Sequence, residues 1–159
     1  MSGSADQLAN RLVSGGRAIT RANRVGVEQA CLAGKEVLTA AGMAAGLPSP
    51  GGVIRGVGVR GSKWRVRYDV KGYENPVGII RMYGAVHLVN NDTSAHEIAP
   101  RRKKALAFPD GGVRGGPVHH PGTRGKKFFE KAEPVIVRQS ERIITQTVRG
   151  HLARVFTGS

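Results

Sequence analysis

The segment from residue 93 to residue 133 constrains the fold of this 159-residue chain more than any other. It holds four of the eight prolines and three of the five histidines, and its basic residues alternate with short apolar stretches. Each proline removes a backbone donor and restricts the residue before it, and paired glycines favour turns. We therefore expect an extended, turn-rich segment, the predicted arm, that lies on a neighbouring surface instead of folding into the chain's own core.

Residues 1–46, at the start of the chain, have a helical pattern. Leu8, Leu12 and Ile19 recur at helical spacing, and further apolar residues continue that spacing toward residue 41. The pair Gly15–Gly16 interrupts the pattern, so we expect a short helix, a break or kink, and then a longer helix. The helix should end at Gly46, because prolines follow closely.

Residues 53–92 have the pattern of a small antiparallel sheet. Apolar residues from Trp64 to Val70 alternate with charged residues from Arg65 to Lys71, which predicts a half-buried strand. A strand through residues 53–59 should precede it across a turn at Gly61–Ser62, and a strand over residues 77–83 should follow. The chain then leaves the sheet in a short bend or helical turn at residues 85–92.

The predicted arm contains two short extended pieces, residues 96–98 and 105–108, which we expect to form a hairpin with each other. Residues 134–157 predict a C-terminal helix, because Ile136, Ile144 and Leu152 fall on one stripe. Phe128–Phe129 begin this last element, and Pro134 marks the start of the helix or a break close to it. The fold class is therefore α+β. One domain is expected, with N-terminal helices and a C-terminal helix packed on a small antiparallel sheet that carries a long extended arm.

The net charge of +14 favours a polyanionic partner, such as nucleic acid, an acidic protein surface or anionic lipid. Contacts from such residues to phosphates are independent of sequence and sensitive to salt. A solvated loop or a contact to an acidic protein is the alternative. The cations of the predicted arm that would face DNA or an acidic partner are Arg101, Arg102, Lys103, Lys104, Arg114, Arg124, Lys126 and Lys127.

The sequence offers no set of residues suited to catalysis or metal binding. The acidic residues Glu97, Asp110 and Glu130 lie apart among cations, and the histidine spacing around His119–His120 matches no common ligand pattern. The single cysteine, Cys31, lies in a helix-like stretch and is expected to be a small buried apolar residue. We expect neither an enzyme nor a cofactor. No apolar run reaches membrane-spanning length and no signal peptide is visible, so we expect a soluble protein made in a cytoplasm, with no membrane partner.

Two sequence patterns in the predicted arm, in a fixed order, resemble a known family. The first pattern, "H-x-I-x-P, then K-x-L-x-F", is matched by His96–Pro100 and Lys104–Phe108. The second pattern, "HPG-T, then P-F-x-x-A", is matched by His120–Thr123, Lys127–Phe129 and Ala132. Together they resemble the neck-protein family of long-tailed, siphovirus-type bacteriophages, also called head–tail connector or tail-component proteins. The specific resemblance covers residues 86–132. Lys127 replaces a frequent proline, and Leu88–Asn91 lacks the acidic residue and glycine of the family's "hxxE-x-G" turn.

The resemblance implies a structural virion protein that forms a ring or collar at the head–tail interface. Such a ring joins the DNA-filled head to the tail around the DNA conduit, and it is assembled in the host cytoplasm. The implied partners are further copies of the chain, the portal, adaptor or head-closure (stopper) proteins, the tail terminator or major tail protein, and genomic duplex DNA without sequence preference. The implied interface residues are His96, Ile98, Pro100, Leu106, Phe108, His120, Pro121, Gly122, Phe128 and Phe129.

Three other functions are alternatives to the neck protein. A tail terminator that caps the tail tube has a related layout and lies next to the neck. A free nucleic-acid-binding protein without sequence specificity would also account for the positive charge. An enzyme is the most distant alternative, because no acid–base pair or nucleophile stands out.

Overall fold

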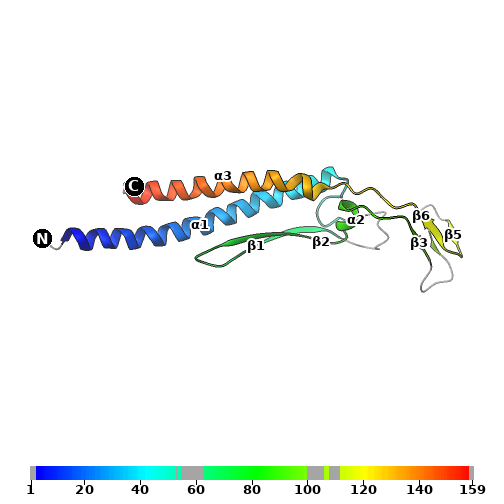
Figure 1. Ribbon diagram of the computed structural model, residues 1–159, viewed down its shortest axis with the longest axis horizontal. Helices are drawn as coiled ribbons and strands as arrows, with labels where there is room; N and C mark the ends of the chain where they lie inside the picture. Colours follow the sequence, from blue (N-terminus) through cyan, green and yellow to red (C-terminus); the bar gives the residue numbers. More distant parts are fainter. Residues whose placement is uncertain (1–2, 53, 55–62, 100–105, 108–111, 158–159) are drawn as a thin grey trace.

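The computed structural model describes residues 3–52, 54, 63–99, 106–107 and 112–157. These residues form an α+β fold with a long helix at each end of the chain and three two-stranded antiparallel sheets, which confirms the predicted fold class. Figure 1 shows an elongated molecule in which α1 (Gly3–Ala44) and α3 (Phe128–Thr157) run side by side in opposite directions. A two-stranded ribbon lies along α1, and a second hairpin projects from the end far from both termini.

Helix α1 is continuous through Gly15–Gly16, so the predicted break at this pair is wrong. An interior glycine costs a helix only about 1 kcal/mol relative to alanine, and tertiary packing of the rest of the helix outweighs that cost. The end of α1 follows the prediction. Gly46 adopts a φ of 97°, its N–H donates to the carbonyl of Met43, and the N–H of Leu47 donates to the carbonyl of Gly42. These two bonds form a Schellman motif.

Small residues allow α1 to lie close to α3 and to the ribbon. A Cβ at Gly26 would lie 3.1 Å from the Cα of Ile144 on α3, and Ala22 is fully buried one turn earlier. Gly34 lies between the side chains of Ile80 and Ile136. The predicted stripe of α3 therefore faces α1, as Ile136 and Ile144 show.

The ribbon consists of β1 (Arg65–Lys71) and β2 (Val77–Tyr83), which pair antiparallel with Arg65 opposite Tyr83. Its predicted alternation is confirmed: Trp64 and Val66 are buried, Tyr68 and Val70 are half-buried, and the charged residues that alternate with them are exposed. Gly72, with a φ of 79°, stands in the turn between the strands. The strand predicted before β1 lies almost entirely outside the described residues.

The core lies where α1, the ribbon and α2 (His87–Asn90) meet the beginning of α3. Trp64 is its largest fully buried side chain, and its Nε1–H donates to the carbonyl of Pro48 at 2.8 Å. Helix α3 begins at Phe128, earlier than the predicted residue 134, and Pro134 lies inside the helix. The buried core residues are Leu38, Leu47, Ile54, Trp64, Val66, Ala85, Val86, Phe128 and Ala132.

Candidate functional site

The predicted arm forms two nested strand pairs. β3 (His96–Ile98) pairs with β6 (Val118–His120), and β4 (Leu106–Ala107) pairs with β5 (Val113–Arg114), both antiparallel. The prediction that residues 96–98 and 105–108 pair with each other is therefore wrong. Each piece pairs instead with the returning chain, which makes one long hairpin of residues 93–123, the projecting hairpin.

The projecting hairpin stands clear of the body of the molecule (Figure 1). Residues 94–99, 112–113 and 115–117 are exposed, and the apolar residue Val113 is 68% exposed. The described residues of the hairpin therefore lie outside the chain's own core, as expected, whereas the end of the predicted arm does not, because Phe128 and Ala132 are buried in the core. However, backbone pairing within the hairpin already gives it a defined shape, so this shape does not depend entirely on a neighbouring surface.

Two histidines face each other across the stem of the hairpin. His96 and His120 are cross-strand partners with ring centroids 5.1 Å apart. Nδ1 of His96 lies 2.8 Å from the carbonyl oxygen of Ser94 and donates to it, whereas Nδ1 of His120 accepts the N–H of Gly122. His119 is exposed, as the alternation of a strand requires. Within the described ranges, no three potential metal-ligating side chains gather.

The hairpin closes at a pair of threonines, Thr93 and Thr123, and an obligatory glycine lies on each side of Thr123 in the sequence. Thr93 and Thr123 exchange backbone hydrogen bonds, and their hydroxyls lie 2.7 Å apart. Gly122 adopts a φ of 86°, and a Cβ at this position would collide with the carbonyl of Thr93. A Cβ at Gly125 would collide with the carbonyl of Asn90. Close backbone approach therefore explains why glycines follow His120–Pro121.

Asn90 joins this closure to helix α3. It is 3% exposed, and its Oδ1 accepts the backbone N–H of Phe129 at 2.9 Å across 39 positions of sequence. Its Nδ2 donates to Oδ1 of Asn91 at 2.8 Å and to the carboxylate of Glu130 at 3.2 Å. Asn90 thus satisfies one of the free N–H groups at the start of α3, as a capping side chain does. We name residues 90–93 and 122–130 the root of the hairpin.

Sequence reasoning missed the role of Asn90, although a signal was present. Asn90, Asn91 and Asp92 are three consecutive residues of the types that cap helices and turns. Asp92 also contributes, since its Oδ1 accepts the N–H of Gly125 at 2.8 Å. That bond, and to a smaller extent the hydrogen bond from Lys127, holds the pKa of the Asp92 carboxyl below its usual value.

Lys127 has a backbone conformation that proline does not adopt. Its φ is 51°, its N–H donates to the carbonyl of Asn90 at 3.0 Å, and its Nζ lies 3.0 Å from Oδ2 of Asp92. Proline fixes φ near −65° and has no N–H. The junction into α3 must therefore differ from that of a chain with the proline that is frequent in the resembled pattern.

Phe128 was expected to reach a neighbouring subunit, and this expectation is wrong for the folded chain. It is 3% exposed and belongs to the core, because α3 begins at this residue and turns its side chain inward. Phe129 is half-buried, and its ring stacks on that of Phe128 with centroids 4.8 Å apart. Neither ring extends from the projecting hairpin.

The other expected interface and DNA-facing residues divide into three groups. Ile98 and Pro121 are exposed on the projecting hairpin, and Arg124 and Lys126 are exposed at its root. Leu106 lies on β4 and Arg114 on β5, where only the backbone is described. The remaining expected residues lie outside the described ranges: Pro100, Arg101, Arg102, Lys103, Lys104 and Phe108.

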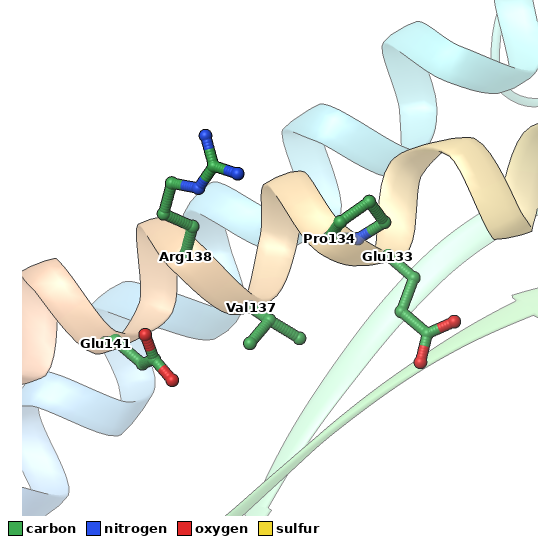
Figure 2. A pocket seen from close by; sticks show the side chains of 5 residues that line it. All are labelled: Glu133, Pro134, Val137, Arg138 and Glu141. Atoms are coloured by element: carbon green, nitrogen blue, oxygen red, sulfur yellow. The ribbon is translucent and has the colours of Figure 1, made fainter.

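Two surface depressions remain as candidates for binding small molecules. One is shallow and lies on α3, where Glu133, Val137 and Glu141 point to one side and Arg138 to the other (Figure 2). The other, of about 610 Å³, is mostly apolar and lies between α1, β2 and α3 beside Cys31. Burial raises the pKa of the Cys31 thiol above its ordinary value. Among the residues that line these depressions, no nucleophile adjoins a base.

None of the helices in the described ranges combines the length and apolarity needed to cross a bilayer. Comparisons of this chain with protein-family models, curated proteins and solved structures find no match. Its function must therefore be inferred from its own residues, their geometry and the resemblance of its motifs.

Proposed function

We propose that this chain is a structural virion protein of the phage neck, which forms a ring at the head–tail interface around the DNA conduit. The observation that carries the proposal is the projecting hairpin. An isolated two-stranded hairpin is marginally stable in water, and its two outer edges present unpaired backbone groups. Such a hairpin gains stability when it lies against a neighbouring subunit.

The two ends of the molecule carry different surfaces, which supports assembly into a ring. The hairpin occupies one end, and the first turns of α1 extend past α3 at the other (Figure 1). In those turns Leu12 is 66% exposed and Val13 is 57% exposed. A contact between unlike surfaces is heterologous, and heterologous contacts generate a ring when the rotation closes.

The geometry of the root also agrees with the motif resemblance. The second pattern, His120–Thr123 with the residues that follow it, coincides with the closure of the hairpin and its junction with α3. The glycines within it are required by close backbone contacts. A pattern of this kind specifies how a projecting element is held, which is what an assembly protein needs.

Two alternatives differ from the neck ring in their measurable behaviour. A tail terminator also forms a ring, but on the end of the tail tube. A free nucleic-acid-binding protein, favoured by the net charge of +14, stays monomeric or dimeric and binds duplex DNA with a steep salt dependence. We propose no enzymatic activity for the chain.

Native mass spectrometry and electron microscopy of the full chain, alone and mixed with the products of neighbouring genes, test this proposal. We expect a closed ring, formed alone or on the portal, adaptor or head-closure protein. A ring that forms only on tail tubes would identify a tail terminator instead. A monomer or dimer in every mixture would contradict both ring assignments.

A further inference from the structure

The outward face of the ribbon has an arrangement of charge that folding does not explain. Arg67 and Arg81 are direct cross-strand partners, and both are exposed. Like charges directly opposite each other on a sheet are destabilising. Arg65 and Lys71 extend the positive row along β1, and Asp69 is the carboxylate on the same strand face.

The described residues provide no carboxylate partner for this arginine pair. No ion pair joins Arg67 or Arg81 to a described acidic side chain, whereas Lys127 and Asp92 do form one at the root. The guanidinium of Arg65 lies over the ring of Tyr83, 5.4 Å from its centroid, which holds it at the surface. Among the described residues, Arg67 and Arg81 thus form no ion pair, although Asp69 lies on the same face.

The opposite face of the ribbon is fixed to the body of the molecule. Trp64 and Val66 are buried, and Gly78 lies so close to Cys31 and Val27 of α1 that a Cβ there would collide with them. The ribbon is thus supported along its length, and its charged face has a defined direction. A strand rises about 3.4 Å per residue, so the positive row from Arg65 to Lys71 extends over roughly 20 Å.

We propose that this outward face, through Arg65, Arg67, Lys71 and Arg81, binds the phosphate backbone of duplex DNA without sequence preference. Arg65, Arg67 and Lys71 lie along one strand with Asp69 among them, and a line of net positive charge suits a linear polyanion, since duplex DNA carries a negative charge about every 1.7 Å of its axis. An acidic protein would need carboxylates placed to match each guanidinium. The inference rests on the proposed function, because in a neck ring this face would be turned toward the DNA conduit.

The test compares two double variants that change the charge equally. Arg67→Gln with Arg81→Gln removes the opposed pair, and Arg138→Gln with Arg142→Gln removes two exposed charges from α3. Figure 2 shows that Arg138 extends to the other side of α3 from Glu133, Val137 and Glu141. Binding of the full chain to a fluorescein-labelled duplex is followed by anisotropy between about 50 and 200 mM salt.

For the ribbon variant we expect binding about tenfold weaker at the lowest salt, and a log–log salt slope shallower by about 1.8, or about 0.9 for each lost phosphate contact. The α3 variant should keep the slope of the unmodified chain. Thermal unfolding of the ribbon variant should begin no earlier than that of the unmodified chain, because the substitution removes a repulsion.

Equal losses in both variants would show a dependence on net charge alone and would overturn the proposal. Unchanged binding by the ribbon variant would overturn it as well, and so would binding of the unmodified chain to polyglutamate but not to the duplex. Native mass spectrometry of the same variants, alone and with the neck partners, separates the two proposals. A chain that binds DNA through the ribbon but forms no ring in any mixture would contradict the neck ring and leave the DNA-binding face intact. A ring that does not bind DNA would contradict the DNA-binding face and leave the neck ring intact.

Discussion

Replacement of Asn90 by alanine tests whether the root holds the two halves of the chain together. The side chain is 3% exposed, accepts the N–H of Phe129 and donates to Glu130 and Asn91. Alanine provides none of these groups, so the N–H at the start of α3 loses its partner.

The magnitude follows from the bonds that are lost. Loss of a capping side chain costs about 1 kcal/mol, and a buried donor left without a partner costs about 1–3 kcal/mol. These two costs describe overlapping effects at Phe129, so we expect a decrease of about 2–3 kcal/mol in the free energy of unfolding. For a chain of this size, that decrease lowers Tm by roughly 4–12 °C, at about 2–4 °C per kcal/mol.

The assay is urea and thermal unfolding followed by circular dichroism at a helical wavelength. Asn91→Ala is the matched control, because Asn91 is exposed and, among the described residues, its side chain accepts a single bond, from Asn90. We expect the control to lose less than about 1 kcal/mol. If Asn90→Ala lies within about 0.5 kcal/mol of the unmodified chain, the root does not have the capping role assigned to it.

Three further changes have defined outcomes. Gly122→Ala should lower Tm, because alanine disfavours a φ of 86° by about 1–2 kcal/mol and its Cβ meets the carbonyl of Thr93; an unchanged Tm would contradict the hairpin closure. Asp92→Asn should make Tm less sensitive to acid, with a smaller fall in Tm between about pH 5 and about pH 3 than in the unmodified chain. The reason is that the folded chain lowers the pKa of the Asp92 carboxyl, so the charged carboxylate stabilises the fold above its ordinary pKa, and this contribution is lost as the pH falls. Equal losses in variant and unmodified chain would count against this coupling. Phe128→Ala should destabilise the isolated chain by about 3–5 kcal/mol, and a stable monomer with this change would refute its place in the core.

Local patterns were sufficient to predict the ribbon and the end of α1. The alternation from Trp64 to Lys71 depends on which face of one strand is buried, and it is readable within a few residues. Gly46 with the prolines after it predicts a helix end for a similarly local reason. The glycine pair in α1 was misjudged because packing of the rest of the helix decided the outcome.

Features that depend on distant partners could not be predicted. The start of α3 at Phe128 depends on Asn90, 39 residues earlier, and helical periodicity carries no information about that bond. The pairing of His96 with His120 was missed because a shorter hairpin within residues 96–108 costs less loop entropy on the sequence alone. The alternation of apolar and charged residues predicted that the ribbon has a charged face. That Arg67 lies directly opposite Arg81 could be known only from the register in which β1 and β2 pair.

The most direct test of the neck-ring proposal is the oligomeric state of a variant without the projecting hairpin. A short glycine–serine link replaces residues 96–120 and leaves the pairing of Thr93 with Thr123 in place. Native mass spectrometry should find a closed ring for the unmodified chain, alone or with its neck partners, and a monomer of unchanged helical content for the variant. Rings formed equally well without the hairpin, or no ring from the unmodified chain in any mixture, would contradict the proposal.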